Sequence, residues 1–329
     1  MLNNNRAAEI KWTFDASNPV IKPGGIHKKL DSIRTASVSI VQCGEKYRMY
    51  YWGTGDDRKN RILMAESYVE KPNDWKPLGS ALEPQEDNEY NCVGPGFPFV
   101  MRVNDKIWHM YYCGWGKPRE DKKIPNTTGL AVSEDGGLTW KYHSDKPVIP
   151  CDRSYDNSGT GSVFVLRESG EFRLYYTSIG DYFNKPDGVQ AYNGDVIPLI
   201  GIAYAVSDDG INFRKPYDNL LIKPREFDTE PYEYICSKPW IVKDGGVYRM
   251  WVNTCGTRYR VRSLVSDDGL TWNWNQSGEL GEMAVGEAGA FDDNQRSYAT
   301  VVKYGDEYRC WYTGNTFGFT GIGFATGCI

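Results

Sequence analysis

Carboxylates and aromatic rings gather in the segments that precede five apolar stretches of the chain. The carboxylates are Asp31; Glu86, Asp87 and Glu89; Asp152 and Asp156; Asp228, Glu230 and Glu233; and Glu287, Asp292 and Asp293. The aromatic residues among them are Tyr90, Tyr155, Tyr232, Tyr234 and Phe291. Carboxylates accept hydrogen bonds from hydroxyl groups and rings stack on C–H faces, so this combination suits a sugar. Paired carboxylates also supply the acid and the base or nucleophile of glycoside hydrolysis, although simply solvated acidic loops give the same pattern.

Four basic residues lie near the same segments, namely Arg34, Arg153, Lys238 and Arg296. Guanidinium and ammonium groups bind the oxygens of anions directly, so these residues could together hold a phosphate or a sugar carboxylate. The alternative is that each long side chain caps a neighbouring carboxylate. The sequence leaves both interpretations open.

A repeated strand motif must position these residues. It consists of an aromatic residue, a basic residue, a soft apolar residue and a further aromatic or Val pair, and it begins at Tyr47, Trp108, Phe172, Tyr248 and Tyr308. An apolar run and a tight turn precede each copy, which is typical of a β-hairpin. A third β-rich run follows each copy, and in three copies it enters a Ser-(Asp or Glu)-Asp-Gly turn that leads to an aromatic residue.

Four strands in each of five units predict an all-β, five-bladed β-propeller that spans residues 1–329 as a single domain. The fifth unit ends after its third strand. The segment Ile10-Lys11-Trp12-Thr13-Phe14 offers the missing strand, because Trp12 matches the aromatic residue that starts the fourth strand elsewhere. We therefore expect the N-terminal strand to close the last blade and to leave no open sheet edge.

Differences between the units indicate where function resides. The acidic turns recur with a fixed aromatic offset, so we expect them to stabilise turns and not to bind calcium. His109 stands where the other units carry Arg, which indicates a structural role, whereas His27 is kept as a candidate. The connections between the second and third strands vary in length, and variable loops on a rigid scaffold concentrate function. The site is therefore expected on that face, at the central funnel.

The five-fold unit resembles the five-bladed glycoside hydrolases, which are the arabinanase/β-xylosidase-like enzymes with the invertases and mannoside phosphorylases as relatives. The apolar inner strand, the Tyr-Arg-Met-Tyr-Tyr strand at Tyr47–Tyr51 and the Ser-Asp-Asp-Gly turns carry this resemblance. In that family a catalytic carboxylate precedes the inner strand. The position ten residues before each lead aromatic instead holds Ser37, Pro98, Ser162, Lys238 and Tyr298. Any catalytic carboxylates must therefore reach in from further upstream.

Composition excludes several other classes. The formal net charge of −5 gives no reason to expect nucleic acid or an anionic membrane as a partner. The N-terminal residues lack an apolar signal core and no run approaches membrane-spanning length, so cytoplasmic residence is expected. None of the eight cysteines forms a Cys-x-x-Cys pair, and we expect neither a metal nor a cofactor.

The resulting hypothesis is a carbohydrate-active enzyme that acts at a glycosidic bond. Asp31 is predicted as base or nucleophile, Glu233 as general acid with a raised pKa, and Asp156 as a stabilising carboxylate. The predicted substrate-binding residues are Arg34, Glu89, Tyr90, Arg153, Tyr234, Lys238, Asp293 and Arg296. Two alternatives remain: a phosphorylase or transferase acting on a phosphorylated or nucleotide-linked sugar, and a sugar-binding propeller without catalysis.

Overall fold

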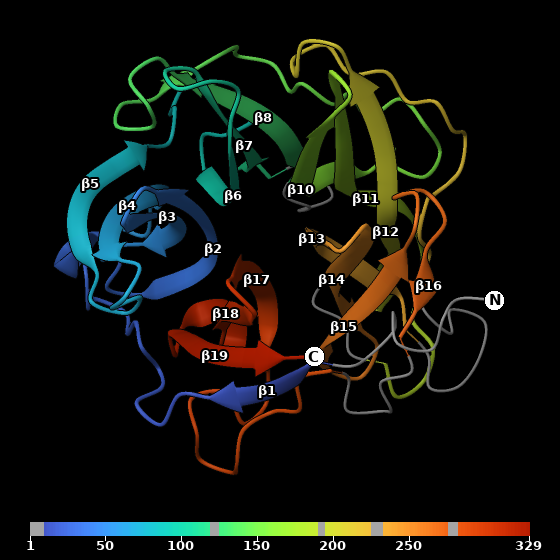
Figure 1. Cartoon of the computed structure of the whole chain (residues 1–329). Helices are drawn as coiled ribbons and strands as arrows, with labels where there is room; N and C mark the ends of the chain where they lie inside the picture. The colour runs from blue at the N-terminus through green and yellow to red at the C-terminus, as the bar shows by residue number, and fades with distance from the viewer. Residues whose placement is uncertain (1–9, 119–124, 190–194, 225–232, 276–281) are drawn as a thin grey trace.

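Almost all regular structure in the protein is β-strand, as the sequence predicts. A computed structural model describes residues 10–118, 125–189, 195–224, 233–275 and 282–329. Within these ranges the only helical segments are the 3₁₀ turn η1 (Lys28–Leu30) and the four-residue α1 (Asn315–Gly318). The strands lie in groups around a central axis, which is the arrangement of a propeller-type fold (Figure 1).

Each repeat of the sequence forms one antiparallel group of strands, and we number these groups as units 1 to 5. Unit 1 holds β2 (Arg34–Cys43), β3 (Lys46–Thr54), β4 (Asn60–Tyr68) and β5 (Lys76–Leu82). Unit 2 holds β6 (Gly94–Arg102), β7 (Trp108–Trp115), β8 (Asn126–Ser133) and β9 (Lys141–Tyr142). Unit 3 holds β10 (Gly159–Glu168), β11 (Glu171–Asn184) and β12 (Val196–Ser207). Unit 4 holds β13 (Ile235–Asp244), β14 (Val247–Cys255), β15 (Tyr259–Ser266) and β16 (Asn273–Trp274).

Unit 5 combines the two ends of the chain. It holds β17 (Ser297–Tyr304), β18 (Glu307–Thr313) and β19 (Ile322–Cys328), and β1 (Lys11–Phe14) pairs antiparallel with β19. The blue β1 lies beside the red β19 in Figure 1. The predicted N-terminal strand therefore occupies the predicted place, where it pairs with the edge of β19 that would otherwise stay open.

The first strand of every unit carries an irregularity at the same point. The register against the second strand shifts between Ala36 and Val38 in unit 1, and at the corresponding place in units 2 to 5. The bulged residues are Ser37, Phe97, Gly161, Lys238 and Tyr298, and all except Gly161 have positive φ. The equivalent positions in units 2 and 3 are thus Phe97 and Gly161, one residue before the Pro98 and Ser162 that counting from the lead aromatic selects. None of the five is a carboxylate.

The acidic turns are structural, as the sequence predicts. In the third of them, Asp268 accepts hydrogen bonds from the amides of Leu270 and Thr271 and from the Ser266 hydroxyl, and these donors lower the pKa of Asp268 to about 2. Asp135 and Asp209 accept equivalent hydrogen bonds. The turns also join the units, since the hydroxyls of Tyr50, Tyr111 and Tyr175 each donate to a glycine carbonyl in the turn of the next unit.

The core lies between the strand groups and closes around the axis. Phe99, Phe164 and Trp240 extend from the first strands of units 2, 3 and 4, with ring centroids 4.6 to 5.7 Å apart. These rings hold the inner strands in place and so fix the positions of the bulged residues beside them. No helix among the described residues is long and apolar enough to cross a membrane.

Candidate functional site

A belt of aromatic side chains lies where the second-to-third-strand connections meet the axis. Trp52 of β3 and Trp115 of β7 have ring centroids 4.7 Å apart, and Phe97 contacts both. Phe97 also packs edge-on against Tyr298 at 4.8 Å, and Tyr298 stacks on Phe317 of α1. We call this set the aromatic belt: Trp52, Phe97, Trp115, Tyr298, Phe317 and Phe319. Rings on a variable-loop face suit stacking on a sugar, so the belt defines the candidate site.

Arg34 lies within this belt without an anionic partner. Its guanidinium carbon is 4.3 Å from the centroid of the Trp52 ring and 4.5 Å from that of Phe319. No described carboxylate or carbonyl accepts a hydrogen bond from this guanidinium, and its Nε is buried without a partner. Burial lowers the pKa of Arg34 to about 10, so the group remains charged at neutral pH. An ordered guanidinium held between two rings is prepared to bind an anion or a polar sugar group.

The short segment α1 positions two rings of the belt through a strained backbone. Thr316 and Phe317 both have left-handed φ and ψ angles, at φ values of 52° and 56°. Left-handed backbone is costly for residues with a Cβ and persists only where the surroundings enforce it, which is common at functional sites. The strained backbone places two rings of the belt, because Phe317 packs on Tyr298 and Tyr259 and Phe319 lies over Arg34.

A small cavity adjoins the belt between units 3 and 4. It measures about 170 Å³, and its lining includes Asn126, Ile179, Tyr182, Tyr234 and Tyr259. Asn126 accepts a hydrogen bond from the Trp115 indole at 2.7 Å, which connects the cavity to the belt. Tyr234, predicted to bind substrate, is therefore buried in the wall of this cavity and belongs to the neighbourhood of the belt.

Glu233, which directly precedes the cavity-lining Tyr234 in the chain, is buried next to a basic side chain. Its Oε1 accepts hydrogen bonds from the Thr254 hydroxyl at 2.9 Å and from Nη2 of Arg262 at 3.1 Å. Its Oε2 is buried and has no hydrogen-bond partner among the described residues. Desolvation raises the pKa of Glu233, and the charge of Arg262 opposes this rise. The pKa of Glu233 is therefore shifted upward, as a general acid requires, and a protonated Oε2 would have a proton to donate.

The other two predicted catalytic carboxylates lie in a repeated contact. Asp31 accepts a hydrogen bond from Tyr51 at 2.6 Å, and Asp156 accepts one from Tyr176 at 2.8 Å. Asp292 of unit 5 has the same contact with Tyr312 at 2.9 Å. A contact that recurs in units 1, 3 and 5 serves the fold, because it ties the segment before the first strand to the second strand. The catalytic assignments of Asp31 and Asp156 stay predictions.

Unit-specific partners surround these two carboxylates. Tyr51 also contacts Nδ1 of His27 at 2.8 Å, while Nε2 of His27 accepts a hydrogen bond from the Gly79 amide. Burial lowers the pKa of His27, which favours the neutral ring. Asp156 forms an ion pair with the buried ammonium of Lys215 at 2.5 Å. Asp228 and Glu230, which the sequence also placed in the acidic segments, lie outside the described residues.

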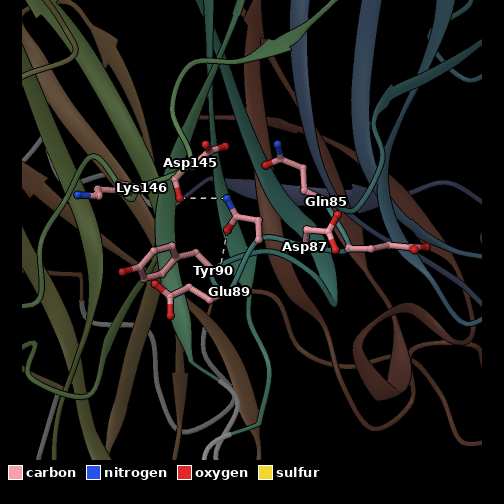
Figure 2. Close-up of a pocket in the computed structure, with 8 residues that line it drawn as sticks. Gln85, Asp87, Glu89, Tyr90, Asp145 and Lys146 are labelled. Atoms are coloured by element: carbon pink, nitrogen blue, oxygen red, sulfur yellow. Dashed lines mark hydrogen bonds between the residues drawn. The ribbon is translucent and has the colours of Figure 1, made fainter.

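Glu89 and Tyr90, predicted to bind substrate, line a separate surface pocket. Figure 2 shows this pocket, which the segment 85–90 forms together with Asp145 and Lys146. Asn88 organises it by donating to the Asp145 carbonyl at 3.0 Å and accepting from the Tyr90 amide at 2.8 Å. Among the described residues, no hydrogen bond, ion pair or ring contact joins Glu89 or Tyr90 to the aromatic belt, although Tyr90 lies one residue before the buried Asn91.

The remaining predicted binding residues are dispersed. Arg296 is buried in an ion pair with Asp292 at 2.7 Å and lies over the ring of Phe14. Its charge is therefore paired within unit 5. Arg153 lies 3.5 Å from Asp218. The carboxylate of Asp293 accepts hydrogen bonds from Asn315 and from the Gly289 amide, which anchors α1. Lys238 donates to the Ala299 carbonyl and the Thr300 hydroxyl of unit 5. The structure therefore does not assemble the four cations into one anion site.

The aromatic belt lies on the face where the sequence predicts the site, but most of its residues were not among the predicted site residues. Trp52, Trp115, Phe317 and Phe319 belong to the ends of second strands or to the loops that follow them, which were the predicted functional loops. Their position next to these loops is the sequence signal that marks them, whereas the predicted site residues are mostly charged. Among the described residues, no three His, Cys, Asp or Glu side chains lie together as a metal site requires.

Two curated proteins are similar to this chain, one over most of its length and one over about half. The uncharacterized protein Rv1502 of Mycobacterium tuberculosis strain H37Rv is 28% identical over 288 residues, which cover 86% of this chain and 88% of that protein. The 1,2-beta-oligomannan phosphorylase of Thermoanaerobacter sp. strain X514 is 25% identical over 187 residues, which cover 52% of this chain and 58% of that enzyme. No protein-family model matches the chain.

Solved structures share the fold over nearly the full length. A chain described as a glycoside hydrolase superposes with a TM-score of 0.74 at 17% identity and covers 99% of this chain and 96% of its own. A second belongs to work on GH130 mannoside phosphorylases and related hydrolases that target beta-1,2 mannosidic linkages in Candida mannan. It gives a TM-score of 0.70 at 15% identity and covers 97% of this chain and 94% of its own. The resemblance to propeller-type glycoside hydrolases that the sequence indicates is confirmed.

Proposed function

We propose that this chain is a carbohydrate-active enzyme that cleaves or transfers a glycosidic bond at the aromatic belt, with Glu233 as the general acid. The observation that carries the proposal is the carboxyl group of Glu233. It is buried, directly precedes the cavity-lining Tyr234, has one oxygen without a partner among the described residues, and has a pKa raised by desolvation. The similarity to glycoside hydrolases and to an oligomannan phosphorylase supports the same class of chemistry.

Replacing the proposed acid tests this assignment directly. Glu233→Gln keeps the shape and the hydrogen bond from Thr254 but removes the proton that would be donated to the leaving group. We expect the turnover of a natural oligosaccharide to fall by about 10²- to 10⁴-fold. A substrate with an activated aryl leaving group needs less protonation, so its turnover should fall much less. Equal losses on both substrates would exclude Glu233 as the acid.

Glu282 provides a matched control within the same protein. It is another buried glutamate whose pKa is raised by desolvation, and its Oε1 accepts hydrogen bonds from the indoles of Trp12 and Trp251. Its Oε2 is also buried without a partner among the described residues. Glu282→Gln should lower thermal stability. It should change the turnover of the oligosaccharide and of the aryl substrate by the same factor, because Glu282 contacts no residue of the belt.

A second candidate is a phosphorylase or a transferase that acts on a phosphorylated or nucleotide-linked sugar. Arg34 favours it, since a charged guanidinium fixed between Trp52 and Phe319 lacks an acceptor among the described residues. A phosphate oxygen would satisfy this group. Cleavage should then depend on inorganic phosphate and yield a sugar phosphate, and Arg34→Met should raise the phosphate concentration needed. Full activity without phosphate, unaffected by Arg34→Met, would support hydrolysis.

A sugar-binding protein without catalysis is the third reading. The bulged positions beside the axis hold no carboxylate, and this absence is its supporting observation. Tight binding of glycans to the belt without turnover across a broad substrate panel would favour it over both enzymatic candidates.

We further propose that the chain forms a single five-bladed propeller over residues 1–329, with units 1 to 5 as the blades and β1 closing the ring. Contacts between units 5 and 1 support this closure. The Ser37 amide donates to the Thr313 hydroxyl at 3.0 Å, the Thr300 hydroxyl donates to the Val38 carbonyl, and the Trp311 indole donates to Asn73. A low-resolution solution envelope that is open between these units would contradict it.

A further inference from the structure

Cations close four of the junctions between neighbouring units on the face opposite the aromatic belt. In each case the residue that pairs with the lead aromatic in the strand register lies over that aromatic ring and reaches into the preceding unit. Arg102 and Arg167 donate to the carbonyls of Gln42 and Val103. Lys243 and Lys303 form ion pairs with Glu168 and Asp244, each at 2.5 Å. The distances from these four cations to their rings are 4.8, 5.1, 4.4 and 5.9 Å.

At the junction between units 5 and 1, the residue that pairs with the lead aromatic is not basic. The residue that pairs with the lead aromatic Tyr47 is Gln42, whose amide donates to Gly44 in its own turn. The position that holds Glu168 or Asp244 in units 3 and 4 is Tyr304 in unit 5, which bonds Glu70 at 2.6 Å. Gln42 thus replaces the basic residue of the other four units, and Tyr304 replaces the carboxylate of units 3 and 4. Arg309 of unit 5 crosses this junction instead, because it donates to the Val69 carbonyl at 2.7 Å and lies 6.0 Å from the Tyr47 ring.

A cavity lies at this junction, beside Gln42 and Tyr304. It measures about 460 Å³ and is lined by Gln42, Gly44, Glu45, Tyr68, Val69, Glu70, Lys71 and Tyr304. This volume falls within the range of small-molecule sites, which is roughly 300–1,000 Å³. Tyr68 is 57% exposed, so a large aromatic ring faces solvent in the lining. The cavity lies beside the β2–β3 turn and is distinct from the belt, which lies at the other end of the strands.

The lining favours a neutral polyhydroxylated ligand. Tyr68 and Tyr304 present rings for stacking, while Glu45, Glu70 and the Gln42 amide offer hydrogen-bond acceptors for hydroxyl groups. One face of each ring already carries a cation, because Lys46 lies 5.4 Å from the Tyr68 centroid and Arg309 lies 3.9 Å from that of Tyr304. The lining carries charges of both signs, Glu45 and Glu70 against Lys71, so it gives no strong preference for an anionic or a cationic ligand over a neutral one.

We propose that this cavity is a second carbohydrate site, which binds a neutral oligosaccharide at the junction of units 5 and 1. Binding there depends on Tyr68 for stacking and on the absence of a basic residue at position 42. The site is separate from the proposed reaction at the belt, so it can exist whether or not Glu233 is a catalytic acid.

Hydrogen–deuterium exchange of the full chain tests the site locally. The probes are neutral tetrasaccharides of mannose, xylose, arabinose and glucose, each titrated to millimolar concentration. We expect at least one of them to slow exchange in peptides that cover residues 40–47 and 66–72. Tyr68→Ala should weaken this effect by about tenfold in ligand concentration, as expected for the loss of one stacked ring. Gln42→Arg, which restores the basic residue of the other units, should abolish it.

Leu138→Ala is the matched control, because Leu138 is 49% exposed in the acidic turn of unit 2 on the same face. It should leave the protection intact, and thermal melting should verify that all three variants fold. The proposal is overturned if no tetrasaccharide protects these peptides, or if Tyr68→Ala and Gln42→Arg leave the protection unchanged. Protection that grows with protein concentration in the absence of sugar would also overturn it, since a second copy of the chain would then occupy the cavity.

Discussion

Lys238 carries a buried ammonium group with no carboxylate beside it among the described residues. Its Nζ donates to the carbonyls of Tyr298 and Ala299 and to the Thr300 hydroxyl, at 3.4, 2.9 and 3.0 Å. Burial lowers the pKa of Lys238 to about 7. The three acceptors match the three protons of an ammonium, so this side chain joins the bulges of units 4 and 5 beside the axis.

The lowered pKa predicts how stability depends on pH. Between about pH 7 and the unfolded pKa of about 10, the unfolded chain binds more protons at this lysine than the folded chain does. Lys238 therefore makes the free energy of unfolding rise with pH in this window, by about 1 kcal/mol for each pH unit. Urea denaturation from pH 6 to 9 should show this slope in the parent and lose it in Lys238→Met. Identical slopes would mean that Lys238 has an ordinary pKa.

Asp156 distinguishes a role in the fold from a role in catalysis. Asp156→Ala removes the partner of the Tyr176 hydroxyl and of the buried Lys215 ammonium. Removing one member of a buried ion pair costs about 3 kcal/mol, so we expect a large loss of stability in chemical denaturation. If the role is structural, the folded fraction retains its turnover. A variant that is as stable as the parent but inactive would instead support the predicted catalytic role.

At the scale of elements, α1 combines backbone strain with the placement of Phe317 and Phe319. Thr316 has a φ of 52°, where a β-branched residue is strongly disfavoured and asparagine is tolerated. Thr316→Asn should therefore stabilise the protein by about 1 kcal/mol and raise the melting temperature by about 2 °C.

Thr13→Asn in β1 is the control for this prediction, because Thr13 pairs with Thr326 in extended backbone where threonine is preferred. It should lower the melting temperature. A decrease for Thr316→Asn as well would show that the Thr316 side chain contributes more than its backbone strain costs.

The hairpins were the elements most accessible to prediction. Each first and second strand is encoded by an apolar run, a Gly- or Asp-rich turn and the aromatic motif, which lie next to one another in the chain. The bulges were not accessible, since nothing local to Phe97 or Gly161 marks the extra residue. Counting from the lead aromatic consequently selected Pro98 and Ser162, because the hairpins of units 2 and 3 contain one residue more between the bulge and the lead aromatic than the count assumed.

At the scale of the whole molecule, β1 holds the end of the chain to its beginning. Its Trp12 packs edge-on against Trp251 of unit 4, and its Phe14 packs against Tyr312 and beneath Arg296. Deleting residues 1–16 exposes the edge of β19 and the rings that β1 covers. We expect this truncation to abolish cooperative unfolding in thermal melts.

A shorter deletion of residues 1–9 leaves β1 in place and serves as the control. Its melting temperature should stay close to that of the parent. A 1–16 truncation that melts at the parent temperature would refute the closing role of β1.

Features that depend on neighbouring residues could be predicted from the sequence alone. The five strand motifs, the acidic turns and the candidate strand around Trp12 all follow from side-chain alternation and turn chemistry, which act over a few residues. The face that carries the variable loops also followed, because strand direction alternates and loop lengths can be read directly. Glu233 became a candidate through its place before a first strand.

The contacts between units could not be predicted from the sequence, because they form only when the strand groups pack together. The belt joins Trp52, Phe97, Tyr298 and Phe317, residues as far apart in the chain as units 1 and 5. Burial gave Glu233 its raised pKa and left Arg34 without an acceptor, and neither property is encoded in residue type. The physical reason is that desolvation and ring contacts depend on which side chains face one another across the axis, and that is fixed only when the strand groups pack together.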